Sequence, residues 1–361
     1  MGVIEGKKKI FYDRKTGREI WEIGIEGSDC VPTYMYFQSF SQDERYIIFA
    51  SNRTGKFELY RMEIETNQII QITKDFGNCY NFTCFNEEVI FNDGETITGI
   101  NVETLEKRII IEKEEEWLSI FGGPAISEKN KKIACFFKDI NENIGIVYTD
   151  IENPEIKRIY RFPLWIKEVS HLIASPSDEF ILTFNILPDK QDNFQLPPTE
   201  RARAWKIDIE KEKLEPFLIM PKGFRATHEY WGHNDNLRLY FHKKTVPNFT
   251  PVFISSIDIS GSDYKEHFYS ETRKLGHSSI SYDNKFIVSD VQEKGENEFY
   301  LISLETGNSE IICWPNSSCS SERNQLGHVH PSFSPSGKFI VFSSDFNGKT
   351  SVYIIPLNLN F

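Results

Sequence analysis

Short runs of alternating apolar and polar residues recur at a regular spacing along the chain. Each unit starts with a turn rich in Ser, Pro, Asp or Asn, followed by an apolar strand, a polar Asn/Gly turn, a second apolar strand and a shorter outer strand. Gly, Asn and Asp supply the positive φ angles or side-chain hydrogen bonds that tight hairpin turns need. The pattern predicts antiparallel β-hairpins, and no segment has a sustained helical period.

Seven such units recur at about 40–50 residues, the spacing typical of propeller blades. The units are 40–73, 86–111, 126–160, 175–217, 232–268, 280–313 and 333–357. A pair of β-sandwiches is the alternative, but seven units in phase disfavour it. We therefore predict an all-β fold, a seven-bladed β-propeller, that forms a single domain over residues 1–361.

The last unit stops after its third strand, and the missing strand has a candidate at the other end of the chain. Residues 18–24 (REIWEIG) follow a Thr16-Gly17 turn and have the pattern of an outer strand. We predict that this N-terminal strand completes the last blade and closes the ring. Closure would leave only short strand edges exposed to aggregation.

Composition supports a β fold and narrows the classes of function. Aromatic residues make up 14% of the chain, and they favour pleated, half-buried surfaces. The formal net charge of -12 argues against a general binder of nucleic acid or anionic membranes, although a local cationic pocket can still hold a small acidic substrate. The pattern makes no prediction of the oligomeric state.

The chain has no stretch near the ~18 apolar residues that a membrane span needs, and its start lacks the apolar core of a secretory signal. Its six cysteines are scattered, without metal-binding pairs or a dense disulfide framework. We expect reduced thiols and a cytoplasmic protein without a membrane partner.

The eight histidines are not placed uniformly in the repeat. His171, His228, His277 and the pair His328/His330 each lie a few residues before the first strand of a unit. These positions are equivalent in the repeat frame, and equivalent positions on successive blades point towards a common axis. We expect four blades to present imidazoles to one pocket.

The densest cluster is RNQLGHVHPSF, which contains Gln325, His328 and His330. His328 and His330 alternate, so on an extended strand they share one face, and Gln325 can offer an amide oxygen. With His277 from the preceding unit, three imidazoles and one amide would suit Mn(II), Fe(II), Co(II), Ni(II) or Zn(II). The alternative is a pair of histidines that bind backbone groups at a blade edge.

A cationic cluster is the second candidate. Arg201 and Arg203 precede a strand, and His228 and Glu229 lie in ATHEYW. The planar donor fork of Arg203 can bind a carboxylate bidentately, and a neutral His228 can act as a general base. The alternatives are an exposed strand arginine for Arg203 and, for Glu229, a partner that orients an imidazole.

In these motifs the chain resembles oligogalacturonate lyase, a polysaccharide lyase family with a seven-bladed propeller of the TolB type. The similarity runs from about Asp13 to the C-terminus and is strongest in the first and last blades. The motif Gln325-x-x-His328-x-His330 matches the family's metal motif, and His277 stands at the remaining ligand position. Arg203 precedes His228 by 25 residues, which matches the family's catalytic pair in type and interval.

The resemblance implies β-elimination on short, digalacturonate-like oligogalacturonides in cytoplasmic pectin breakdown. It implies Mn(II) as the cofactor, although another divalent transition metal would suit the same ligands. The metal would neutralise the substrate carboxylate, with His228 as the base and Arg203 as a stabilising cation; the resemblance leaves open which of these two is the base. His171 and Arg201 are candidate substrate contacts.

The chain departs from the family in three segments. Cys30-Val31-Pro32 stands where relatives carry a His-Arg pair, Asn185-Ile186-Leu187 replaces a His-Glu-Gly stretch, and the segment between His277 and His328 is short. A lyase on another uronate-containing oligosaccharide therefore stays an alternative, as does a non-enzymatic TolB-like interaction module. The complete set of four candidate metal ligands favours a lyase.

Overall fold

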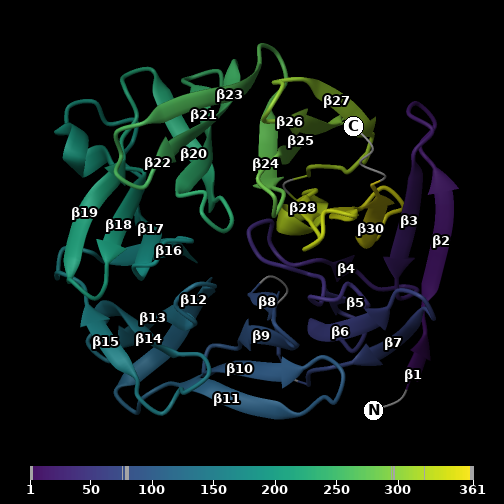
Figure 1. Cartoon of the computed structure of the whole chain (residues 1–361), viewed down its shortest axis with the longest axis horizontal. Helices are drawn as coiled ribbons and strands as arrows, with labels where there is room; N and C mark the ends of the chain where they lie inside the picture. Colours follow the sequence, from purple (N-terminus) through teal and green to yellow (C-terminus); the bar gives the residue numbers. More distant parts are fainter. Residues whose placement is uncertain are drawn as a thin grey trace. The chain divides into compact units, whose positions relative to one another are not determined.

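The structure, a computed structural model, describes residues 3–74, 76–77, 81–293, 295, 297–320 and 322–357. Its described strands form seven sheets of four or five strands, and neighbouring strands of each sheet follow the chain as in propeller blades (Figure 1). Helix within the described ranges is limited to two short 3₁₀ segments, η1 (Pro198–Arg201) and η2 (Asn324–Gly327). The prediction of an all-β, seven-bladed propeller is confirmed.

The chain divides into two compact units. Unit 1 comprises Met1–Ile90, Ile100–Lys107 and Arg273–Phe361, and unit 2 comprises Phe91–Gly99 and Arg108–Thr272.

Unit 1 contains three complete sheets. Their strand orders are β1 (Val3–Glu5), β7 (Gln68–Gln71), β6 (Glu58–Glu63), β5 (Tyr46–Ser51), β4 (Cys30–Val31); β24 (Leu275–Ile280), β25 (Phe286–Val291), β26 (Phe299–Ser303), β27 (Ser309–Cys313); and β2 (Lys7–Tyr12), β3 (Glu19–Gly24), β30 (Ser351–Pro356), β29 (Phe339–Ser344), β28 (Ser332–Phe333).

Unit 2 also contains three complete sheets. They are β12 (Trp117–Ser127), β13 (Lys132–Asp139), β14 (Ile144–Asp150), β15 (Arg158–Arg161); β16 (Glu168–Ala174), β17 (Ile181–Leu187), β18 (Ala204–Asp208), β19 (Lys213–Leu218); and β20 (Phe224–Trp231), β21 (Arg238–Thr245), β22 (Val252–Asp258), β23 (Tyr264–Ser270). A seventh sheet, with residues from both units, has the order β11 (Lys107–Glu112), β10 (Thr96–Asn101), β9 (Glu88–Asn92), β8 (Phe82–Phe85).

Burial within a sheet depends on the position of the strand. All six residues of β5 are buried, whereas β15 is mostly exposed. A middle strand packs on both faces, so both sets of its alternating side chains enter apolar contacts. In unit 2, for example, the rings of Phe136 and Phe162 on one sheet lie 5.9 Å and 4.8 Å from that of Phe184 on the next.

The N-terminal strand completes the last blade as predicted. Strand β3 pairs with β30, with Ile23 opposite Val352, so the start and end of the chain share one sheet (Figure 1). The preceding turn is also where the sequence placed it, since Gly17 has φ +70° and donates its amide to the Asp13 carbonyl at 2.8 Å. The sequence did not predict β1 and β2, which add fifth strands to two sheets.

The predicted units lack the first strand of several sheets. β12, β16, β20 and β24 all begin before the corresponding predicted unit. Each of these strands shifts register against its neighbour, between Ser170 and Ile173 in β16 and between Thr227 and Tyr230 in β20. Such bulges interrupt the alternation of side chains, so these strands lack the pattern that identified the others.

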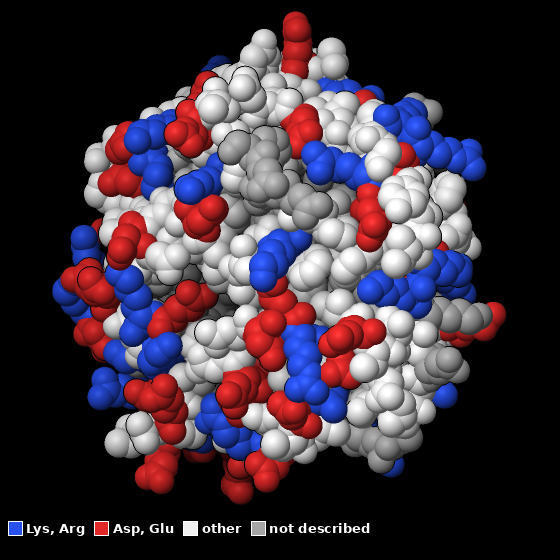
Figure 2. All heavy atoms as spheres, turned by 45° about the vertical axis from the view of Figure 1, so that its right-hand side comes forward, with Lys and Arg blue, Asp and Glu red and all other residues white. Residues whose placement is uncertain are grey.

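Basic and acidic side chains lie side by side over much of the surface displayed in Figure 2. Among the described residues, no helix is long and apolar enough to cross a membrane. The five described cysteines (Cys30, Cys84, Cys135, Cys313 and Cys319) are free, and Cys79 lies outside the described residues.

The role of β3 can be tested with one substitution made at two sites of the N-terminal segment. Ile23 is 0% exposed, so Ile23→Ala should lower the free energy of unfolding by about 2–4 kcal/mol, because it leaves a cavity between β3 and β30. Ile10 on β2 is 54% exposed, so Ile10→Ala should change the free energy of unfolding by less than about 0.5 kcal/mol. Urea denaturation of both variants measures the difference; equal effects would contradict the assignment of β3 to the blade core.

Candidate functional site

Three histidines of unit 1 form a compact group. His277 lies on β24, His328 follows η2, and His330 lies two residues before β28. Each offers a ring nitrogen, and these three atoms lie within 4.8 Å of one another. The sequence-based expectation that the motif histidines meet His277 therefore holds within this unit, and the group could hold a metal ion.

The route by which His328 and His330 approach each other differs from the prediction. They do not alternate on a strand, because β28 begins only at Ser332. Instead His330 takes a left-handed conformation with φ +46°, whereas His328 is extended, and their ring centroids lie 5.6 Å apart. A non-glycine residue in this region is uncommon and occurs mainly at turns and at functional sites.

A buried carboxylate fixes His277. Asp290 on β25 accepts hydrogen bonds from the His277 backbone amide and, at 3.1 Å, from its ring Nδ1. With Nδ1 as the donor, the ring is in the tautomer whose Nε2 carries a free lone pair, and this nitrogen can bind a metal. Gly276 leaves room for this carboxylate, since a Cβ there would come within 2.5 Å of Asp290 Oδ1.

Electrostatics keep the carboxylate charged and two imidazoles neutral. Burial alone would raise the pKa of Asp290, but the interaction with His277 and its hydrogen bonds outweigh burial and lower it. Burial and the neighbouring His277 lower the pKa of His328 to about 4 and that of His330 well below its usual range. Metal binding needs neutral imidazoles, so both rings are in the required protonation state at neutral pH.

Gln325 supplies a further oxygen on η2. Its side-chain Oε1 is buried and has no hydrogen-bond partner among the described residues. A buried amide oxygen without a partner costs free energy, and a cation near it would remove that cost. This orphaned oxygen, together with the three imidazoles, fits a divalent transition metal.

Two residues that the sequence did not single out lie against the metal group. The Gln292 side-chain amide contacts the His328 ring, with Nε2 atoms 3.2 Å apart. The half-buried Tyr34 ring lies 4.8 Å from His330 and 6.1 Å from His277, between centroids. A buried Asp in the apolar run FIVSDV was the one sequence signal for Asp290; Gln292 and Tyr34 had none.

Arg203 in unit 2 is held by two carboxylates. Its Nε and Nη2 donate to Glu229 at 2.6 Å and 3.2 Å, and its Nη1 donates to Asp189 at 3.2 Å. Burial would lower the pKa of Arg203, but Glu229 and Asp189 raise it overall. Arg203 therefore stays a cation, and with a side-chain exposure of 13% it is not the exposed strand arginine of the alternative.

Glu229 lies at the centre of this group. Burial would raise its pKa, but Arg203, followed by the nearby His171, lowers it. Asn185 completes the surroundings: in the orientation that satisfies both contacts, its amide donates to the Arg203 carbonyl at 2.9 Å and accepts from Nη2 at 3.2 Å. Glu229 is thus the ionic partner of Arg203.

His228 and His171 occupy equivalent bulges in unit 2. Both have positive φ, +59° and +56°, and both lie where the first strand of a sheet shifts register. The His228 ring packs at 84° against that of the buried His242, with centroids 5.8 Å apart. The prediction that all the motif histidines line one pocket stays a prediction, because these two and the metal group belong to different units.

Arg201 points into unit 2 rather than outward. It is buried on η1, donates to the Gln191 carbonyl at 3.3 Å, and stacks on Phe194 at 4.9 Å. These contacts fix the loop between β17 and η1. They favour a structural role for Arg201, whereas the sequence suggested a substrate contact.

The role of Asp290 can be tested through metal affinity. Asp290→Asn should weaken Mn(II) binding by about 10- to 100-fold, because an amide can donate to Nδ1 of His277 and so favour the wrong tautomer. Calorimetric titration with Mn(II) measures this effect, and His267→Ala in unit 2 is the control with unchanged affinity. Wild-type affinity in Asp290→Asn would contradict the proposed orientation of His277.

Two curated lyases are similar to this chain in sequence. Among curated proteins, the oligogalacturonate lyase of Dickeya dadantii is 23% identical over 398 residues, covering 98% of each chain, and the oligogalacturonide lyase of Pectobacterium atrosepticum is 22% identical, covering 95% of this chain and 94% of that protein. No family model matches the chain.

Solved structures extend the likeness to the fold. An oligogalacturonate lyase in complex with manganese superposes with a TM-score of 0.84 at 19% identity, over 99% of this chain and 98% of that one. The oligogalacturonate lyase of Vibrio parahaemolyticus superposes with a TM-score of 0.83 at 19% identity, over 100% of this chain and 99% of that one. The chain therefore resembles oligogalacturonate lyases over its whole length, in sequence and in fold.

Proposed function

We propose that this protein is a metal-dependent lyase that cleaves short oligogalacturonides by β-elimination, with Mn(II) as its cofactor. The observation that carries the proposal is the compact group of His277, His328 and His330. Gln325, three residues before His328, has a buried side-chain oxygen without a hydrogen-bond partner among the described residues. The manganese complex of a similar lyase supports the choice of metal. Cytoplasmic location is part of the proposal, since the described cysteines are free thiols.

The reaction would remove the proton on carbon 5 of a uronate, form a double bond between carbons 4 and 5, and expel the glycosidic oxygen on carbon 4, which takes up a proton from water. That proton is weakly acidic, so the chemistry requires a base and stabilisation of the developing negative charge. Bound Mn(II) would neutralise the substrate carboxylate and so lower the cost of forming the anion. Gln325, His277, His328 and His330 would hold it.

His228 is the proposed base. An imidazole can accept a proton near neutral pH, and half-exposure leaves His228 open to a substrate. Arg203 is unsuited to this task because its pKa is raised and it remains protonated. We therefore propose His228 and not Arg203 as the base.

Arg203 has a different proposed role. Glu229 and Asp189 already compensate its charge, so it is a fixed, oriented cation and not a free clamp for a carboxylate. A preorganised charge of this kind needs no reorganisation as the anion develops. Arg203 would then act as an electrostatic stabiliser.

Activity can be tested by incubating the metal-loaded protein with digalacturonate and following the ultraviolet absorbance of the new carbon–carbon double bond. The wild type should give a rising signal, whereas His330→Ala should give none and should bind no Mn(II). A signal with another uronide but not with digalacturonate would show that the substrate is a different uronide from the one proposed. No signal with any uronide would refute the lyase and favour an interaction module.

His228→Ala separates the base from the metal group. This variant should bind Mn(II) with wild-type affinity and lose at least about 100-fold in kcat, the scale of a general base. His267→Ala, a histidine of the same unit that bonds to Ser256, should keep its turnover. Normal turnover in His228→Ala would show that another group removes the proton.

A further inference from the structure

The segment of unit 1 that carries Gln325, His328 and His330 lies between β27 and β28. Among its described residues, the regular structure is limited to η2, a 3₁₀ helix of four residues without a side-chain cap. A single 3₁₀ turn has poor hydrogen-bond geometry and does not fix its own position. The place of the Gln325 side chain therefore depends on what the rest of unit 1 provides around η2.

Side chains next to two strands bind the backbone of this segment. Thr350, just before β30, donates its hydroxyl to the Leu326 carbonyl at 2.9 Å. Ser343, on β29, donates its hydroxyl to the His328 carbonyl at 2.7 Å. These carbonyls thus have fixed partners in place of a strand ladder, as buried backbone groups require.

Arg323, at the start of η2, connects the segment to two others. Its Nη2 donates to Asp29 Oδ1 at 2.6 Å and to Thr350 Oγ1 at 2.8 Å, and its Nε lies 3.6 Å from Asp345 Oδ2. Asp29 lies between β3 and β4, and Asp345 follows β29. One guanidinium therefore ties η2 to two separate parts of unit 1.

Both carboxylates are buried and bind further groups. The side chains of Asp29 and Asp345 are 5% and 4% exposed, and that of Arg323 is 28% exposed. Asp345 accepts from the Ser318 backbone amide at 2.7 Å and from its hydroxyl at 2.6 Å, and Asp29 accepts from the Thr350 amide at 3.0 Å. Buried carboxylates need such donors, so both are fixed points that orient the arginine fork.

We propose that Arg323 is a positioning residue of the metal centre: its clamp between Asp29 and Asp345 sets the place of Gln325, two residues further on. The inference rests on the proposed function, in which Gln325 is a metal ligand, and deepens it. Arg323 acts through the backbone of η2 and not through contact with the metal or the substrate. A chain without this clamp keeps its three histidines but loses the fixed amide oxygen.

Calorimetric titration of the metal-free protein with Mn(II) tests the clamp. Arg323→Met keeps an apolar stem without the guanidinium and should weaken Mn(II) binding at least about tenfold, the scale of a lost partner outside the ligands. Gln325→Ala should also weaken binding. The double variant Arg323→Met/Gln325→Ala should bind no more weakly than Gln325→Ala alone, because both changes remove the same ligand. Additive losses would overturn the inference.

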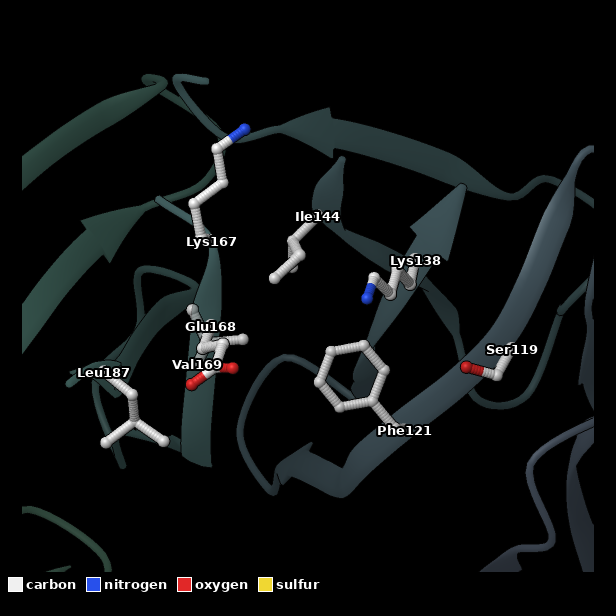
Figure 3. Close-up of a pocket in the computed structure, with 8 residues that line it drawn as sticks. All are labelled: Ser119, Phe121, Lys138, Ile144, Lys167, Glu168, Val169 and Leu187. Atoms are coloured by element: carbon white, nitrogen blue, oxygen red, sulfur yellow. The ribbon is translucent and has the colours of Figure 1, made fainter. Parts of the chain in front are cut away.

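Two variants control for the loss of an ion pair. Arg18→Met in unit 1 removes an arginine of similar exposure, 29%, that binds Glu310 at 2.8 Å. Lys138→Met in unit 2 removes a lysine that pairs with Glu142 and lines the pocket drawn in Figure 3. Both should bind Mn(II) with wild-type affinity. An equal loss in Arg18→Met and Arg323→Met would overturn the inference.

Urea denaturation of the metal-free variants separates positioning from stability. A lower free energy of unfolding does not by itself change the affinity of the folded protein for Mn(II). Reduced stability of Arg323→Met with wild-type affinity would therefore make the clamp structural only and refute its role at the metal. If Arg323→Met does not fold, Arg323→Lys replaces it; this variant keeps the charge but not the planar fork and should still weaken Mn(II) binding, and wild-type affinity would refute the clamp.

The two proposals fail in different ways. If Arg323→Met weakens Mn(II) binding through Gln325 but the wild type cleaves no uronide, the lyase is refuted and the clamp stands. If the wild type cleaves uronides and Arg323→Met binds Mn(II) as tightly as the wild type, the clamp is refuted and the lyase stands. A wild type that binds no Mn(II) would refute both.

Discussion

The pair of buried hydrogen bonds between Asp290 and His277 is the interaction on which the metal group depends. A carboxylate with no exposure is costly unless it is hydrogen-bonded, and Asp290 obtains its hydrogen bonds from the ring and the backbone of a single residue. In return it sets the tautomer of that ring and directs its free nitrogen. The other two imidazoles stay neutral because burial and the neighbouring His277 lower their pKa. Three imidazoles whose ring nitrogens lie within 4.8 Å of one another can hold a cation, and this gives the group its functional meaning.

The fold presents these side chains by departing from regular strand geometry. His171, His228 and His330 all have positive φ, and the first two lie in bulges on the first strand of a sheet. Regular strands would point alternate residues into the packed faces between sheets. A bulge re-aims one side chain without disturbing the rest of the ladder. The same device therefore serves different side chains in successive blades.

The sequence predicted the regular strands well and the irregular ones poorly, for the same physical reason. Repeats of apolar and polar residues revealed the outer three strands of most blades and the N-terminal strand β3. The bulged first strands have no such repeat, so only the histidines of β16, β20 and β24 marked them, and nothing marked β12. Gln292 and Tyr34 became visible only through contacts between separate strands and loops. The ionic partner of Arg203 was likewise not predicted, because Glu229 adjoins His228 in sequence but its carboxylate reaches Arg203.

The central claim is that the histidine group is the metal centre of a lyase, and titration of metal against turnover tests it most directly. Metal-stripped protein would receive increasing Mn(II) in the presence of digalacturonate, and the formation of the carbon–carbon double bond would be followed by ultraviolet absorbance. The account predicts a rate that starts near zero, rises with Mn(II), and saturates at one ion per chain. A rate that is independent of added metal, or saturation unaffected by loss of His330, would contradict it.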